Sequence, residues 1–154
     1  MKKHPILLVE DNPDDVFLAT RIMTKNTDAE VVVRYNGEDA LAYLGTNQAY
    51  QDTLLPAVVF LDLKLPDMSG VEVLEALRND SRTHDLPVVI LSSSHLYREL
   101  DRCKELQVID CLQKPLGSAE FQRIMEQVSG LTDERSHFLD NCSVESRVDF
   151  GQIR

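Results

Sequence analysis

Val58-Val59-Phe60-Leu61-Asp62 is the stretch of sequence that decides the fold. Its apolar residues form a short, continuous run rich in β-branched side chains. Such a run predicts a buried strand in a parallel sheet that is covered on both faces. Asp62 then ends the run with a carboxylate, and residues 63–70 turn the chain toward a helix. Open α/β sheets place their ligand sites at the carboxyl ends of strands, so we predict that Asp62 lies in a functional site.

Four further apolar runs alternate with helical patterns on either side of this strand. They lie at residues 6–9, 31–33, 88–91 and 108–112. Asn12 as a cap and Pro13 at the first helical position indicate the start of the first helix. The fourth is suggested by Leu96, Leu100 and Cys103. This alternation predicts an α/β fold with a doubly wound, five-stranded parallel sheet and helices on both faces.

Composition restricts the class of protein. The chain has 154 residues, enough for one domain with its own core, and its net charge of −10 argues against binding to nucleic acid or to anionic lipid. Its apolar runs are too short for a membrane span or a secretory signal, so we expect a cytoplasmic protein. Cys103, Cys111 and Cys142 are odd in number and lack CxxC spacing, which favours reduced thiols.

The periodic pattern does not extend to the end of the chain. We expect residues 1–128 to form the domain. From residue 129 to residue 154 the pattern fades into polar residues with isolated aromatic and aliphatic ones. We predict that this segment is a C-terminal extension, either flexible or docked on a partner.

The predicted strands end in residues that carry chemistry. The first is followed by Glu10 and Asp11, the third by Asp62, the fourth by Ser92 and the fifth by Lys114. Parallel strands bring these ends to one edge of the sheet. Neighbouring carboxylates repel each other unless a cation binds them, and hard oxygen ligands suit Mg²⁺. An ammonium and a hydroxyl are donors for phosphoryl oxygens, and an aspartate can accept a phosphoryl group as a nucleophile.

This set of residues, in this order and spacing, resembles the receiver domain of two-component response regulators over roughly the first four-fifths of the chain. The resemblance implies a flavodoxin-like sheet of order 2-1-3-4-5. It also implies that a histidine kinase phosphorylates Asp62. The remaining implied roles are Mg²⁺ binding by Glu10, Asp11, Asp62 and the backbone carbonyl of Lys64, and phosphoryl binding by Lys114 and Ser92. The Lys114–Pro115 bond resembles the cis peptide of the family.

A narrower resemblance concerns small stand-alone receivers that partner phytochrome-type kinases. It rests on residues 7–15 and on the long segment 45–56. For such a protein we expect a phosphoacceptor switch, with no enzymatic activity beyond its own phosphorylation and dephosphorylation. The fourth helix, fifth strand and fifth helix would form the face that binds a partner or a second copy of the chain.

Three positions depart from the pattern of the family. Cys111 stands where the family usually has an aromatic residue, whose ring moves between an exposed and a buried rotamer when the receiver switches. A thiol is smaller and cannot make this movement. Glu10 replaces the commoner aspartate, and Ser92 replaces the commoner threonine while keeping the hydroxyl. We expect the phosphoacceptor chemistry to be retained.

Two other functions compete with the phosphoacceptor switch. An aspartate-nucleophile phosphatase of the haloacid dehalogenase type would carry a second aspartate two residues after the nucleophile, where this chain has Lys64. A receiver that binds partners without being phosphorylated would not need the complete set of site residues.

Overall fold

The computed structural model describes residues 4–45, 54–93, 97–133 and 148–149. In these residues helices and strands alternate along the chain. They are β1 Ile6–Val9, α1 Pro13–Asn26, β2 Val31–Arg34, α2 Gly37–Leu44, β3 Val58–Asp62, α3 Gly70–Asn79, β4 Val88–Ser92, α4 Tyr97–Glu105, β5 Asp110–Gln113, α5 Ser118–Asp133 and β6 Val148–Asp149. Among them no helix has both the length and the apolar character that a membrane span requires.

The strands form one parallel sheet in the order β5-β4-β3-β1-β2-β6. The predicted order 2-1-3-4-5 is therefore confirmed. The short strand β6 was not predicted; it comes from the expected C-terminal extension and pairs with β2 at the edge of the sheet. Residues 129–133 of that extension continue α5, whereas 134–147 and 150–154 lie outside the described residues, as do 46–53 and Leu96. The division of the chain at residue 128 stays a prediction.

The fifth strand begins later than predicted, at Asp110 instead of residue 108. The reason is the end of α4. The Val108 N–H donates to the Cys103 carbonyl, and Gln107 has a φ of 62°. Both features belong to a left-handed turn that closes a helix, so the backbone of Val108 is used by the helix end and not by the sheet.

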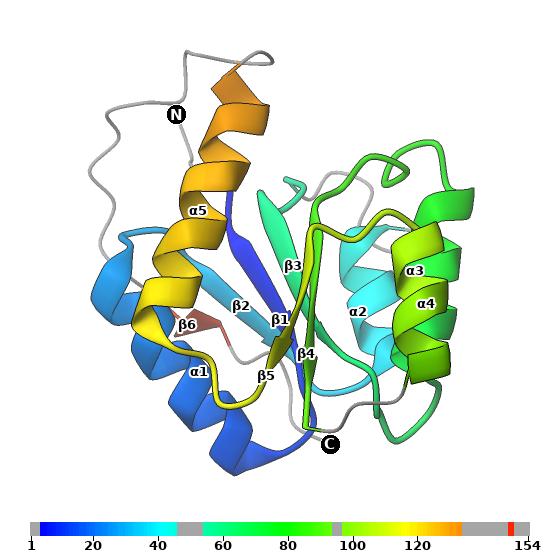
Figure 1. Cartoon of the computed structure of the whole chain (residues 1–154), viewed down its shortest axis with the longest axis horizontal. Coiled ribbons are helices and arrows are strands. Elements are labelled where there is room, and N and C mark those ends of the chain that lie inside the picture. The colour runs from blue at the N-terminus through cyan, green and yellow to red at the C-terminus, as the bar shows by residue number, and fades with distance from the viewer. Residues whose placement is uncertain (1–3, 46–53, 94–96, 134–147, 150–154) are drawn as a thin grey trace.

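Alternate residues of each strand face opposite sides of the sheet. Leu8, Val33 and Phe60 pack on one side with α1 and α5, whereas Leu7, Val32 and Val59 pack on the other with α2, α3 and α4. Figure 1 shows these two helical layers with the sheet between them. The chain leaves each of the parallel strands β1–β5 at the carboxyl edge of the sheet and then enters the next helix. Strand ends and helix starts therefore meet at this edge.

Caps fix the helix starts at this edge. The Asn12 side chain accepts hydrogen bonds from the backbone N–H groups of Asp14 and Asp15, and Pro13 opens α1 as predicted. Ser69 and Glu72 form a capping box at the start of α3. The first turns of α1 and α3 are thereby held beside the ends of β1 and β3.

Candidate functional site

The fold brings the predicted strand-end residues to one edge. Asp62 and Ser92 are the last residues of the neighbouring strands β3 and β4, Glu10 directly follows β1, and Lys114 directly follows β5. The side chains of Glu10 and Asp62 are only 2% and 7% exposed. Buried ionised groups are costly unless they are paired, so their partners decide what the site can do.

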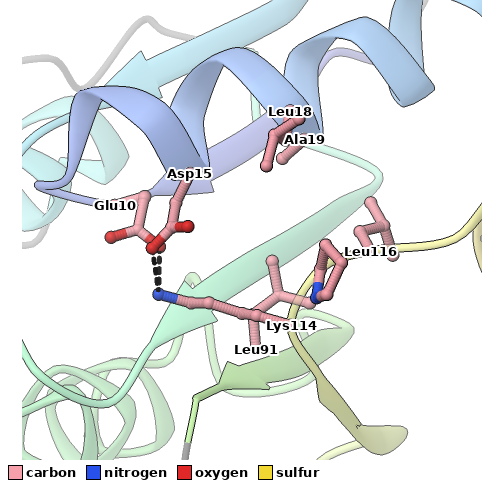
Figure 2. Close-up of a pocket in the computed structure, with 8 residues that line it drawn as sticks. Glu10, Asp15, Leu18, Ala19, Leu91, Lys114 and Leu116 are labelled. Carbon is pink, nitrogen blue, oxygen red and sulfur yellow. Dashed lines mark hydrogen bonds and ion pairs between the residues drawn. The ribbon is translucent and has the colours of Figure 1, made fainter.

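Lys114 is the common partner of the carboxylates. Its Nζ lies 3.0 Å from Asp62 Oδ2 and 3.1 Å from Asp15 Oδ2, and it also contacts Glu10 Oε1. Figure 2 shows the Lys114 side chain extended toward Glu10 and Asp15. The Lys114–Pro115 peptide bond is cis, as predicted. The sequence predicts Lys114 at this edge of the sheet but does not single out Asp15.

Glu10, Asp11 and Asp62 form an acidic cluster in which one carboxylate oxygen from each residue lies within 4.8 Å of the other two. Burial, reinforced by the neighbouring Asp62 carboxylate, raises the pKa of Glu10 to about 8 against the opposing effect of Lys114. This crowding of carboxylates fits a hard divalent cation, which would relieve the repulsion. The acidic cluster is therefore a candidate metal centre.

The electrostatics of Lys114 match this picture. Burial alone would lower the pKa of its ammonium, but hydrogen bonds to Glu10 and Asp62 outweigh burial and raise it. Lys114 therefore stays charged at any physiological pH. A fixed positive charge beside Asp62 is suited to the oxygens of a phosphoryl group.

Asp62 is fixed from both sides. Its Oδ1 accepts a hydrogen bond from the Lys64 N–H at 3.1 Å, while its Oδ2 faces Lys114. Lys64 also bridges to Ser69, so the loop after β3 folds back on itself. The role of the Lys64 carbonyl as a metal ligand stays a prediction.

Gly70 permits this fold-back, whereas the sequence places it only in the segment 63–70 that turns the chain toward a helix. A Cβ at Gly70 would lie 2.4 Å from the Asp62 carbonyl oxygen and 2.7 Å from the Leu63 Cα. Both are backbone atoms that cannot move aside easily. The Gly70 N–H also donates to the Leu63 carbonyl at 2.8 Å. A side chain at Gly70 would therefore push α3 away from the strand that carries Asp62.

Ser92 and Cys111 lie on the β4–β5 side of the site. Ser92 is buried, and its carbonyl accepts the Lys114 N–H at 2.9 Å, so the two residues are neighbours at the edge of the sheet. Cys111 pairs with Ile90 in β4 and is partly buried against the core on the α2–α4 side. Burial raises the pKa of its thiol. The switch role of Ser92 and the consequence of a thiol at Cys111 stay predictions.

Comparison with known proteins places this arrangement in a family. A family model described as the response regulator receiver domain matches residues 6–126. Response regulator Rcp1 of Synechocystis sp. is 32% identical over 127 residues, which cover 82% of this chain and 84% of Rcp1. The crystal structure of Rcp1 in its Mn²⁺-bound form aligns with a TM-score of 0.68 at 29% identity, over 92% of this chain and 99% of that one.

Two further structures are similar to this chain. The bacteriophytochrome response regulator AtBRR aligns with a TM-score of 0.73 at 38% identity, over 84% of this chain and 94% of AtBRR. The phosphorylated cyanobacterial phytochrome response regulator RcpA aligns with a TM-score of 0.66 at 32% identity, over 85% and 93% of the two chains. Because the family model also spans most of the sequence, this chain belongs to the response regulator receiver domains of two-component systems.

Proposed function

We propose that this protein is a phosphoacceptor switch in which a histidine kinase phosphorylates Asp62. The observation that carries the proposal is the position of the Asp62 carboxylate. It is buried at the end of β3, 3.0 Å from the Lys114 ammonium and within the acidic cluster. A carboxylate so placed has a cation for the incoming phosphoryl oxygens and metal ligands beside it.

The proposed reaction is an in-line transfer to Asp62. One carboxylate oxygen attacks the phosphorus atom of a phosphohistidine, and an O–P bond forms as the N–P bond breaks. The electron pair of the broken bond stays on the imidazole nitrogen. Lys114 stabilises the phosphoryl oxygens throughout, and Ser92 donates its hydroxyl to them. Hydrolysis by water at phosphorus later restores the carboxylate and releases phosphate.

Glu10, Asp11, Asp62 and the carbonyl of Lys64 are the proposed ligands for Mg²⁺. The ion would supply positive charge that neutralises the phosphoryl oxygens during the transfer. The Mn²⁺ bound in the related Rcp1 structure supports a divalent cation of this kind, since carboxylate sites accept both metals.

Intact-mass analysis tests this function. The chain is incubated with Mg²⁺ and acetyl phosphate, and we expect one acid-labile phosphoryl adduct that is absent from Asp62→Asn and absent without a divalent cation. An adduct that persists in Asp62→Asn would contradict the proposal. No adduct on the wild-type chain would favour a receiver that binds partners without phosphorylation, and rapid turnover of a phosphomonoester would favour a phosphatase.

We further propose a kinase of the phytochrome type as the partner. AtBRR and RcpA, both phytochrome response regulators by name, support this choice. Phosphotransfer from a purified phytochrome-type histidine kinase should be faster than from an unrelated histidine kinase at equal concentration. Equal rates from both would contradict the narrower assignment while leaving Asp62 as the phosphoacceptor.

The output of the switch is proposed to be the face of α4, β5 and α5. Phosphorylation places a group of about −1.5 to −2 charges on Asp62, and Ser92 would follow it and shift the loop after β4. That movement would change how this face binds a partner or a second copy of the chain. The cytoplasm stays the predicted location.

A further inference from the structure

Asp15 is a third carboxylate on Lys114 that the phosphoacceptor chemistry does not use. An ammonium has three N–H donors, and Lys114 directs them at Glu10, Asp15 and Asp62. The donors are therefore fully occupied before any phosphoryl group arrives. A phosphoryl group on Asp62 can accept a hydrogen bond from Lys114 only if one of these carboxylates gives up the N–H donor that it now occupies.

Asp15 differs from the other two partners in its position. Glu10 and Asp62 sit at strand ends and are almost completely buried, whereas Asp15 lies in the first turn of α1 and its side chain is 32% exposed. The Asn12 side chain caps the Asp15 N–H at 3.3 Å, which fixes this turn against the end of β1. Figure 2 shows Asp15 and Lys114 facing each other in direct contact, and Leu18, Ala19, Leu91 and Leu116 line the same pocket.

We propose that Asp15 is a positioning residue that draws Lys114 toward α1 and competes with the phosphoryl group on Asp62 for its ammonium. The inference rests on the function proposed above. In the unphosphorylated protein Asp15 helps to balance the charge of Lys114. In the phosphorylated protein the same carboxylate holds part of the ammonium away from the phosphoryl oxygens and adds a negative charge near them.

Both effects predict that loss of the Asp15 charge strengthens binding of the phosphoryl group. Removing the charge of Asp15 frees a donor of Lys114 and lowers the repulsion of an incoming anion. Both changes favour the bound phosphoryl group. Because Asp15 is partly exposed, water screens its charge, and we expect a change of roughly two- to fivefold, the size typical of removing one such ion pair.

Beryllofluoride binding gives an equilibrium test without a transition state. Beryllofluoride mimics a phosphoryl group on a carboxylate, and its occupancy is followed by fluorine NMR at saturating Mg²⁺. We expect Asp15→Asn to bind it roughly two- to fivefold more tightly than wild type, and Asp15→Glu to stay close to wild type. Phosphorylation by acetyl phosphate should accelerate in the same variant and by a similar factor.

The matched control is Asp14→Asn. Asp14 is the exposed neighbour of Asp15 on α1, and it is not among the ion-pair partners of Lys114. The substitution changes the net charge of the protein equally, so a gain in Asp14→Asn as large as in Asp15→Asn would overturn the proposal in favour of a general charge effect. A purely structural role would lower the melting temperature of Asp15→Asn without tightening beryllofluoride binding, and that result would overturn it as well.

The two proposals fail in different ways. If the wild-type chain binds no beryllofluoride and accepts no phosphoryl group, the proposed function is wrong and the role of Asp15 falls with it. If the wild type does both and Asp15→Asn binds beryllofluoride equally or more weakly, only the role of Asp15 is wrong.

Discussion

The carboxyl edge of the sheet and the surface around α4 and β5 differ in how far their charged side chains are buried. At the edge, Glu10 and Asp62 are buried and Lys114 is only 12% exposed, and each depends on the others for a partner. The second region, which we call the α4–β5 surface, consists of Cys103 on α4, Asp110 and Cys111 on β5, and Arg123 on the adjoining α5. Its ion pair, Arg123 with Asp110, is exposed, and its buried group is the thiol of Cys103.

This difference in burial determines which residues of the two regions can be substituted. A buried charge has few acceptable neighbours, because removing one partner leaves the other unpaired in a low dielectric. An exposed pair is screened by water and contributes little. We therefore expect the chemistry of the edge to restrict its residues tightly, and the α4–β5 surface to tolerate a change such as the thiol of Cys111 where the family pattern predicts an aromatic ring.

Lys114→Met should have the largest effect, since it leaves the acidic cluster without its cation. We expect the free energy of unfolding in the absence of divalent ions to fall by about 3–5 kcal/mol. Addition of Mg²⁺ should restore part of that loss, because the ion then neutralises the cluster. Urea unfolding with and without Mg²⁺ measures both quantities.

The control for Lys114→Met is Lys104→Met, at an exposed lysine of α4. It should change the free energy of unfolding by no more than about 0.5 kcal/mol. Similar losses in the two variants would mean that burial of charge does not distinguish the two regions.

Gly70→Ala should come next, because it perturbs the edge through the backbone. The new Cβ would meet the Asp62 carbonyl oxygen at 2.4 Å, and overpacking of this kind costs about 1–3 kcal/mol. Displacement of β3 from α3 should also slow phosphorylation of Asp62. Thermal unfolding and the acetyl phosphate reaction measure the two effects. Gly130→Ala on α5, where a Cβ would meet nothing within 4 Å, is the matched control. It should not slow phosphorylation, and it should raise stability by at most about 1 kcal/mol, because Ala favours a helix over Gly.

The sequence indicates which residues meet at the carboxyl edge, because each of them can be recognised from its immediate neighbours in the chain. Asp62 and Lys114 stand out as polar residues at the ends of apolar runs, and parallel strands necessarily bring such ends together. Four of the five predicted strands begin where the structure places them, because strands that are buried on both faces leave a continuous apolar run in the sequence. The family match then confirmed the fold that these runs implied.

The features that the sequence did not reveal depend on tertiary contacts. Asp15 in a first turn is explained equally well by the helix dipole, and its ion pair exists only because the chain after β5 directs Lys114 toward α1. Gly70 needs the folded-back loop before its missing side chain has a meaning. Strand β6 is two residues long, which is too short for any periodicity to mark it.

Cys103 gives the α4–β5 surface a pH dependence of its own. Burial first, and then Cys111 and Glu99 nearby, raise the pKa of this thiol from 9.0 to about 11. Below pH 9 the thiol is protonated in both the folded and the unfolded state. Between these values the unfolded chain loses the proton first, so the free energy of unfolding should fall as pH rises, by at most about 3 kcal/mol. Urea unfolding across this interval measures the slope.

Cys103→Ala isolates this contribution, since tyrosines and lysines also titrate at high pH. The variant is less stable overall because it loses buried volume, but its stability should fall less steeply with pH than that of the wild type. Equal slopes would show that the Cys103 thiol ionises as easily in the folded state as in the unfolded one.

Arg123→Ala should have the smallest effect. Its Nη2 lies 2.9 Å from Asp110 Oδ2, which is closer than Lys114 Nζ to Asp62, yet the two side chains are 52% and 32% exposed. We expect a loss of about 0.2–1 kcal/mol that shrinks further in high salt. A double-mutant cycle with Asp110→Asn isolates the coupling of this pair. A coupling as large as the loss in Lys114→Met would mean that distance, and not burial, sets the strength of ion pairs in this protein.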